Sequence, residues 1–462
     1  MKTMKHIIWM AALVLTAAIW SACSNKDELA VIEEPAQPRT YTISTTLSPK
    51  DGAQTRSTMT DKGDGSISAE WEVGDQLWVG YYQTNGDYKD ATAEVTAVDP
   101  STKVATITVT LVDPNGGDLF FRYPISFYDR TKDAYTDQTG TLADINANFA
   151  AIWGDGSINV SGSDVTLSRV TMQPQMCIWK FSFTDGSSDI TKDITKLVIE
   201  IPGSYETKTY EVSPSSLGTI YVALYGNVIK GDPICITATT ATGVYRKAAA
   251  SVTLDSGTTY TSMGLALEKA EVGKVFGADG NIYDSATATP GGNTAVALIT
   301  YVGNDAETST TYNHGLALAL EDANSGNTVE LCSQQSHTCL DNQYGDEAAA
   351  KTDMAGIANT DALVGTNTHD HAAAAVARNY NSGTHPVGTS KWFLPSAGQW
   401  DKMISAAGDY ATLMTKAGLR ENFYWSSTER SADKAWNYYF ETGSWYGDSK
   451  GNSLYVRSAF AF

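Results

Sequence analysis

Positive charge is scarce in this 462-residue sequence. It has 32 lysines and arginines against 52 aspartates and glutamates, which gives a formal net charge of −20. Nucleic acids and anionic membrane surfaces attract clustered lysine and arginine, so this balance argues against both as partners. An acidic composition is typical of a protein that stays soluble outside the cell.

The sequence also lacks the short motifs that carry common enzyme chemistry. It has no glycine-rich loop of the P-loop type, no dinucleotide-binding fingerprint and no Gly-x-Ser-x-Gly turn that would present a nucleophilic serine. We therefore expect a binding protein that is not an enzyme and needs no cofactor.

Cysteine is rare, with five residues in the whole chain. Cys177 and Cys235 lie in strand-like apolar runs and are expected to be buried free thiols. Cys332 and Cys339 flank a polar loop and could close a small disulfide in an oxidising compartment. A zinc site at this loop is less favoured, since His337 is the only other good ligand nearby and the C-x₂-C spacing is missing.

A second, weak metal-like grouping consists of His369, His371 and His385. The first two would face one side of a strand but would diverge in a helix. Because the chain looks helical from Ala372 onward, we expect these histidines at a helix start, with Asp370 near its positive end. No third ligand follows His369 and His371 at a spacing typical of a metal site, so the sequence predicts no metal.

The N-terminus carries an export signal. Two lysines precede an apolar run of about fourteen residues, which is too short to span a bilayer and suits a signal-peptide core. The run ends in Trp20-Ser21-Ala22-Cys23, which resembles a bacterial lipobox. This resemblance implies removal of residues 1–22 and anchoring in the outer membrane through a diacylated Cys23. The next five residues, Ser24-Asn25-Lys26-Asp27-Glu28, are similar to the acidic tag that sends Bacteroidota-type lipoproteins to the cell surface.

Residues 41–267 contain short β-rich runs separated by turn residues, after a tether at 23–40. This pattern predicts mainly β structure, and its length favours two antiparallel sandwiches in tandem, at 41–165 and 166–267. The first strand is expected at 41–47. Further strands are expected at 77–82, 91–98, 104–111, 119–123, 177–183, 196–201 and 234–240.

A loop with Thr55-Arg56-Ser57 follows the first strand, and Trp71-Glu72-Val73-Gly74-Asp75 then leads into an aromatic strand. This opening resembles fimbrillin-like proteins, the two-sandwich subunits and tips of type V pili. The resemblance implies that a protease cuts after Arg56 and so releases the first strand with Ile43 and Leu47. Arg39 is the alternative cut site. A strand from another pilin subunit would then add to the exposed sheet edge. An ordinary arginine in a loop is the other interpretation.

From residue 272 the pattern changes to mixed strands and helices. Strands are expected at 294–302 and 314–320, and helices at 346–357, 371–379 and 397–407, the last one capped by Ser396. Four spaced motifs resemble the C-terminal half of bacterial C-type-lectin-like domains of the major-paralogous type. They are Trp392-Phe393-Leu394-Pro395-Ser396, Tyr424-Trp425-Ser426-Ser427-Thr428, Ala435-Trp436-Asn437-Tyr438-Tyr439-Phe440 and Tyr455-Val456-Arg457. The resemblance implies an α+β lectin-like recognition domain at 272–462.

Aromatic residues near a hairpin expected at 435–446 are the candidates for ligand binding. One face of its first strand is expected to pack in the core, whereas the turn at 443–448 is expected to be exposed. We therefore predict that Trp445, Tyr446 and Asp448 contact a ligand. The calcium-binding and sugar-binding tripeptides of C-type lectins are missing, and no cysteine follows Cys339, as a formylglycine-generating enzyme would require.

The sequence thus predicts a surface lipoprotein that acts as a pilus tip or adhesin subunit and binds an unknown host or bacterial glycan or protein. A tip is favoured over a stalk subunit, because residues 457–462 are expected to form a core strand and not a donor strand. The alternative is a non-pilus, glycan-binding surface lipoprotein that keeps its first strand.

Overall fold

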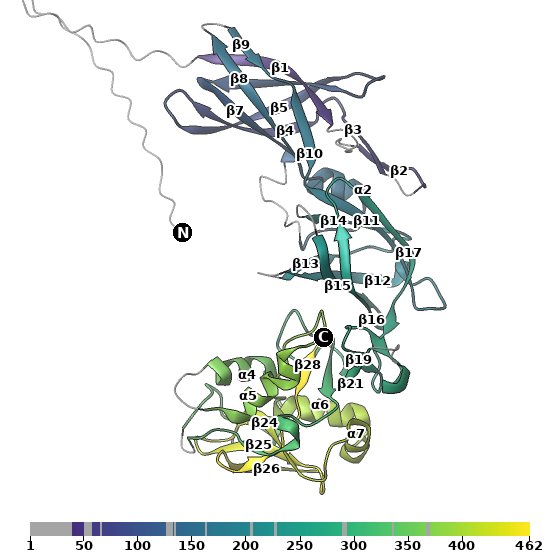
Figure 1. Ribbon diagram of the computed structural model, residues 1–462, viewed down its shortest axis with the longest axis vertical. Coiled ribbons are helices and arrows are strands. Elements are labelled where there is room, and N and C mark those ends of the chain that lie inside the picture. Colours follow the sequence, from purple (N-terminus) through teal and green to yellow (C-terminus); the bar gives the residue numbers. More distant parts are fainter. Residues whose placement is uncertain are drawn as a thin grey trace, which may run out of the picture. The chain divides into compact units, whose positions relative to one another are not determined.

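The computed structural model (Figure 1) describes residues 39–49, 58–64, 67–125, 133, 135–161, 164–203, 207–225, 229–288, 293–334, 337–365 and 370–462. The predicted signal peptide and Cys23, Arg56 and His369 lie outside these residues. The described chain is mainly β and forms several separate sheets. Among its helices, none is both long and apolar enough to cross a membrane.

The first sheet has eight strands and closes on itself. They are β1 (Thr40–Pro49), β4 (Gln76–Gln83), β5 (Tyr88–Val98), β6 (Ala105–Val112), β7 (Pro114–Tyr123), β8 (Ile152–Ser161), β9 (Asp164–Leu167) and β10 (Val170–Pro174). Their order is β10-β1-β6-β5-β4-β7-β8-β9, and a further pairing of β10 with β8 completes the ring. Alternate residues of β6 and β8 are buried, as expected when every second side chain points to the interior.

Two further sheets follow. The three-stranded sheet has the order β14-β11-β17, with β11 (Met176–Thr184), β14 (Ile220–Tyr225) and β17 (Thr259–Ala266). The five-stranded sheet has the order β13-β12-β15-β16-β18, with β12 (Ile194–Pro202), β13 (Thr207–Val212), β15 (Ile229–Thr240), β16 (Gly243–Leu254) and β18 (Glu268–Lys269). One hydrophobic core extends from Ile43 to Leu267 and includes buried residues of all three sheets.

A small hairpin of β2 (Thr58–Asp61) and β3 (Ile67–Glu70) stands beside these sheets. Short helical turns lie at α2 (Leu142–Asp144), η1 (Ile145–Phe149) and η2 (Thr191–Asp193). The strands predicted at 41–47, 77–82, 177–183 and 234–240 are confirmed within a few residues at each end. The first sheet differs from the expected division at 165/166, because β9 and β10 belong to it and carry it to Pro174.

The C-terminal residues form three more sheets. The largest has the order β20-β19-β21-β22-β28, with β19 (Val275–Gly277), β20 (Ile282–Tyr283), β21 (Ala295–Val302), β22 (Gly315–Ala319) and β28 (Ala459–Ala461). The second pairs β23 (Val329–Glu330) with β27 (Ser453–Leu454). The third has the order β24-β25-β26, with β24 (Phe423–Glu429), β25 (Lys434–Tyr439) and β26 (Ser444–Ser449).

The described residues of this part also form the α-helices α3 (Glu347–Ala350), α4 (Gly356–Gly365), α5 (Ala372–Arg378), α6 (Ala397–Ala407) and α7 (Tyr410–Ala417) (Figure 1). Single turns lie at η3 (Ala286–Ala288), η4 (Asn324–Gly326) and η5 (Tyr380–Gly383). Helix α6 begins at a capping box, in which Ser396 accepts from the Gln399 amide and the Gln399 side chain accepts from the Ser396 amide. The helix predicted at 397–407, with Ser396 as its cap, is confirmed at both ends.

Candidate functional sites

Strand β1 lies in the interior of the first sheet. It pairs antiparallel with β6 from Thr40 to Leu47 and parallel with β10 from Leu47 to Pro49. The side chains of Ile43 and Leu47, both on β1, are 6% and 0% exposed and belong to the continuous core. Loss of β1 would therefore leave an apolar groove between β6 and β10, bordered by unpaired main-chain groups. We call this the β1 groove.

The two arginines predicted as cleavage sites differ in what a cut would release. Arg39 is exposed and precedes β1, so a cut after it would leave β1 attached to the sheet. Arg56 lies outside the described residues, between the end of β1 and the start of β2. A cut after Arg56 would separate β1 from everything that follows it.

Asp61 binds the hairpin of β2 and β3 to the three-stranded sheet through β11 and β14. Its Oδ2 accepts from Lys180 Nζ at 2.5 Å and from Tyr221 OH at 2.6 Å, on β11 and β14, and Oδ1 accepts from the Gly63 amide at 2.9 Å. The hydrogen bonds from Lys180 and Tyr221 lower the pKa of Asp61 to about 2. The carboxylate is therefore charged at neutral pH.

Of the predicted ligand-binding residues, Tyr446 is the most exposed. Its side chain is 43% accessible, and its ring packs edge-to-face against Phe423 with the centroids 5.6 Å apart. Phe423 in turn stacks on Tyr439 at 3.9 Å, directly opposite it on β25. We call Phe423, Tyr439 and Tyr446 the aromatic surface.

Trp445 and Asp448, the other two predicted ligand-binding residues, are less exposed than Tyr446 and contact neighbouring side chains. Trp445 is half-buried and packs edge-to-face on Tyr438, with ring centroids 5.0 Å apart. Asp448 accepts a hydrogen bond from Asn437 Nδ2 at 3.1 Å. The prediction missed Phe423 and Tyr439, which join Tyr446 only through the pairing of β24, β25 and β26.

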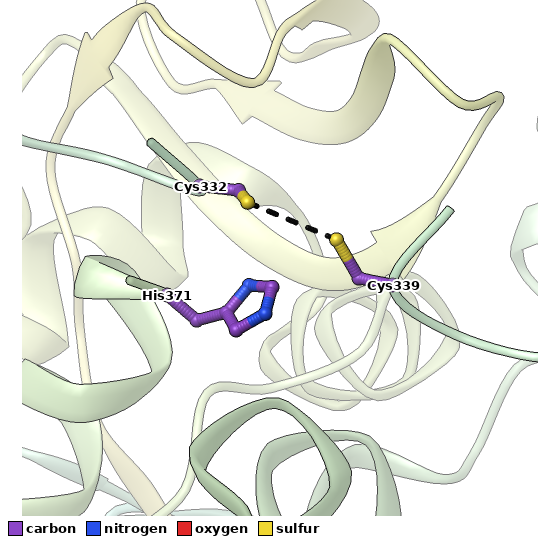
Figure 2. A group of neighbouring side chains, drawn as sticks. All are labelled: Cys332, Cys339 and His371. Carbon is purple, nitrogen blue, oxygen red and sulfur yellow. Dashed lines mark hydrogen bonds between the residues drawn. The ribbon is translucent and has the colours of Figure 1, made fainter. Parts of the chain in front are cut away.

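Figure 2 shows that the side chain of His371 lies beside those of Cys332 and Cys339, although His371 comes more than thirty positions later in the sequence. The two sulfurs are 3.9 Å apart, and the ligand atoms of all three residues lie within 4.8 Å of one another. Cys332 follows β23, Cys339 lies in the loop before α3, and His371 precedes the first turn of α5. Cys332 and His371 are 0% and 4% exposed. We call these three residues the Cys₂His cluster.

Two residues that form a buried ion pair also bind the main chain of both cysteines. Lys450 and Glu429 are 0% and 1% exposed, and Lys450 Nζ donates to Glu429 Oε1 at 2.5 Å. The Cys339 amide donates to Glu429 Oε1 at 2.9 Å, whereas the Cys332 amide donates to the main-chain carbonyl of Lys450 at 3.2 Å. Lys450 Nζ also lies 4.0 Å from Cys339 Sγ.

His371 is tied to the same cluster through its neighbour in the sequence, because the amide of Ser333 donates to the carbonyl of Asp370 at 2.9 Å. Burial raises the pKa of the Cys339 thiol well above its usual range, although the positive charge of Lys450 acts against this shift. Cys339 is therefore a neutral thiol at physiological pH unless a cation replaces its proton.

Of the three histidines grouped from the sequence, His371 belongs to the Cys₂His cluster and His369 lies outside the described residues. His385 Nδ1 lies 3.2 Å from Thr389 Oγ1 and 3.3 Å from the Pro386 carbonyl, and His385 takes no part in the Cys₂His cluster. Burial lowers the pKa of His385. From the sequence we considered His337 as the partner of the two cysteines and placed His371 in a different group. The fold brings His371 to the cysteines instead.

Comparisons with known proteins give structural likenesses only. No protein-family model and no curated protein matches the chain. A fimbrial protein from Bacteroides ovatus is 13% identical, with a TM-score of 0.36, and the match covers 91% of this chain and 100% of that one. Putative cell adhesion proteins from Bacteroides uniformis and Bacteroides eggerthii are 14% and 11% identical, with TM-scores of 0.28 and 0.27. These two matches cover 48% of this chain and 98% and 86% of theirs. TM-scores below 0.5 do not establish a common fold, so the proposals below rest on this chain's own residues.

Proposed function

We propose that this chain is a surface-anchored fimbrial subunit, of the tip or adhesin kind, that assembles by donor-strand exchange. The observation that carries the proposal is the position of β1, an early strand that lies between β6 and β10 and precedes Arg56 in the sequence. A strand in this position can be replaced by a strand of another subunit, because the receiving main chain and apolar groove are the same for both.

Cleavage after Arg56 would start the exchange. Ile43 and Leu47, which fill the β1 groove, would leave with the released segment, and each contributes roughly 1.5–3 kcal/mol through burial of its side chain. The incoming strand would need apolar residues at the matching positions, with polar residues between them. The outer face of β1 fits this demand, since Thr42 and Ser44 pair there with Thr110 and Thr108 at 3.1 and 3.0 Å.

The new N-terminus would remain attached to the folded chain. Cleavage after Arg56 leaves β2, which begins at Thr58, and Asp61 binds this hairpin to Lys180 and Tyr221. Departure of β1 therefore need not unfold the segment that follows it.

A recognition role fits the C-terminal residues better than a donor role. Strand β28 pairs with β22, and Phe460 and Phe462 are 0% and 1% exposed, so this segment would have to leave its own core to serve another subunit. In this proposal residues 272–462 form a C-type-lectin-like recognition domain that uses the aromatic surface. Aromatic rings that expose one edge suit either a sugar ring or an apolar protein side chain. The anchor is a diacylated Cys23, which holds the precursor at the outer membrane until it is cut.

The test follows the N-terminus of the protein at the cell surface. Chain is recovered from the outer surface of cells with and without an arginine-specific protease activity, and its N-terminus is identified by mass spectrometry. The proposal expects Ser57 as the first residue of fibre-bound chain, and it expects Arg56→Ala to abolish both the cut and fibre assembly. Arg39→Ala is the matched control and should assemble normally.

One result would contradict the strand-exchange proposal. A chain that keeps residues 40–49 and a lipidated Cys23 in its surface form, with no fibre-bound species, would instead support a tethered surface binder of glycans.

A further inference from the structure

The spacing of the two sulfurs in the Cys₂His cluster fits metal coordination better than it fits a disulfide. The bond of a disulfide is about 2.05 Å long. Two thiolates bound to one tetrahedral zinc ion, each about 2.3 Å from the metal, stand about 3.8 Å apart. Cys332 Sγ and Cys339 Sγ are 3.9 Å apart, and both lie beside the imidazole of His371 (Figure 2).

We propose that Cys332, Cys339 and His371 bind one divalent, thiophilic metal ion, with Zn²⁺ as the reference ion. This inference does not depend on the fimbrial role proposed above. Sulfur and imidazole ligands are the set that zinc prefers, and hard cations such as Ca²⁺ prefer oxygen ligands. Three protein ligands leave a fourth position for water or an external donor.

The charges around the cluster favour a divalent ion. Two thiolates and a neutral imidazole bound to a divalent cation form a neutral group. The neighbouring Lys450 and Glu429 also cancel each other within their ion pair. A monovalent cation would leave one uncompensated negative charge in a buried site, which is costly. Binding releases one proton from each thiol to solvent, and the imidazole nitrogen that binds the ion must carry no proton.

Hydrogen bonds with Glu429 and Lys450 already hold the segments that carry the two cysteines. Cys339 and Leu340 donate their amides to Glu429 at 2.9 and 3.1 Å, and Lys450 Nζ donates to the carbonyl of His337 at 2.7 Å. The amide of Cys332 is bound to the carbonyl of Lys450. Groups that fix ligands from outside the coordination sphere are typical of metal sites. The ion would tie the segment after β23, the loop before α3 and the start of α5 to one point.

The disulfide predicted from the sequence uses the same two sulfurs. It requires them to approach from 3.9 Å to about 2.05 Å. A chain with this disulfide has no thiolate left for a metal, so the two states exclude each other and can be separated by experiment.

The test uses the full chain, reduced, stripped of metal and carrying Cys23→Ser in every sample. Equilibrium dialysis against Zn²⁺ followed by metal determination should give one zinc per chain. Loss of a group that only supports a ligand typically weakens metal binding by up to about 100-fold. Loss of a ligand itself should therefore weaken zinc binding by more than about 100-fold. This weakening is expected for Cys332→Ser, Cys339→Ser and His371→Gln. Cys177→Ser and His385→Gln, which change the same residue types elsewhere, should bind zinc as the parent chain does.

Co²⁺ supplies a second readout that does not depend on the variants folding. The parent chain with Co²⁺ should show sulfur-to-cobalt charge-transfer absorption, which Zn²⁺ should displace. The proposal is overturned if the reduced parent chain binds no Zn²⁺, or if the Cys332→Ser/Cys339→Ser double variant binds it equally well. A chain isolated with a Cys332–Cys339 disulfide that gains no zinc affinity on reduction also overturns it.

Discussion

Asp322 neutralises a buried arginine in the C-terminal residues. Its Oδ1 accepts from Arg457 Nε and Tyr424 OH, both at 2.9 Å, and its Oδ2 accepts from Arg420 Nε at 2.9 Å. Arg457 is 1% exposed and also donates to the carbonyls of Ala319, Ala417 and Gly418. A buried guanidinium with these carbonyl partners needs one negative charge nearby, and Asp322 supplies it.

Replacing Asp322 by asparagine should therefore destabilise this part strongly. The variant leaves the charge of Arg457 buried and uncompensated, which costs about 3–5 kcal/mol in the free energy of unfolding. Urea unfolding monitored by tryptophan fluorescence measures the loss. The matched control is Asp361→Asn, whose side chain is 62% exposed and pairs with Arg378, and it should change stability by less than about 1 kcal/mol. Equal effects of the two substitutions would contradict this assignment.

Tyr446 should affect recognition without affecting stability. Its ring is 43% exposed, so Tyr446→Ala removes contact area from the aromatic surface while leaving the buried core intact. We expect about tenfold weaker binding, a typical loss for an interface tyrosine, measured as the signal of the full chain on a glycan array. Tyr82→Ala changes a tyrosine that is 45% exposed on β4, and its signal should stay unchanged. If both variants lose the signal alike, the aromatic surface is not the binding site.

At the residue scale, the role of a side chain could be predicted where it depends on neighbouring residues in the sequence. Tyr446 stands in a turn-rich hairpin, and its exposure was expected. Phe423 was missed because its role comes from strand pairing. His371 was grouped with His369 and His385 and not with the two cysteines, because its contact with them joins segments far apart in the sequence. A histidine beside a predicted helix start gives no sign that two cysteines will face it.

Among the helices and strands, those whose ends are marked by capping or turn residues were the most predictable. The bounds of α6 follow from the Ser396–Gln399 capping box and its apolar face, both of which are visible in the sequence. The two partners of β1 could not be inferred, because β6 and β10 come much later in the chain. The same limit explains why β9 and β10 were not assigned to the first sheet.

Leu47 should matter only while β1 occupies its own groove. Leu47→Ala should lower the unfolding free energy of the uncut chain by about 2–5 kcal/mol, the usual cost of truncating a buried leucine. The same variant should match the parent chain after cleavage and strand exchange, since the residue has then left. Denaturant unfolding before and after processing makes the comparison, with exposed Ser44→Ala as the control. A persistent defect in fibre-bound chain would show that β1 had not been exchanged.

The hairpin of β2 and β3 should weaken in acid. The folded state holds the pKa of Asp61 at about 2, below its ordinary value of 3.8, so the stabilisation is complete above pH 4. It should be lost as the pH falls from about 4 to about 2. Hydrogen exchange of the amides of β2 checks this expectation, and Asp61→Asn should exchange fast throughout that window.

Asp99 provides the control for this acid effect. Its pKa is also lowered to about 2, but by Ser101 and Thr102 in its own turn. Asp99→Asn should therefore leave exchange in β2 unchanged. An acid response of β2 that survives in Asp61→Asn would refute the proposed anchor.

At the scale of the whole molecule, Arg246 joins a strand to residues far along the chain. It lies on β16 with 1% exposure and donates to the carbonyls of Gly388 at 2.9 Å and Val387 at 3.0 Å. Its guanidinium also stands 5.3 Å from the ring centre of Phe276. This role could not be predicted from the sequence, because an arginine within a β-rich run is ordinarily expected to face solvent.

Arg246→Met should loosen this connection while filling most of the same space. The lost hydrogen bonds from a charged donor correspond to about 1.5–3 kcal/mol each. We expect faster hydrogen exchange around Val387 and Gly388 and a lower midpoint for thermal unfolding of the C-terminal residues. Lys247→Met, at the exposed neighbouring position, is the control. Unchanged hydrogen exchange in Arg246→Met would mean that contacts other than those of Arg246 hold Val387 and Gly388 in place.

The interior position of β1 also has a mechanical consequence. The strand that occupies this groove is paired with β6 over the whole span from Thr40 to Leu47. A neighbour's strand inserted there would carry tension along its own axis, and this direction loads the hydrogen bonds of the ladder together in shear. Peeling from an edge would break them one at a time and at lower force. The tensile strength of a fibre built in this way would therefore be set by the groove between β6 and β10.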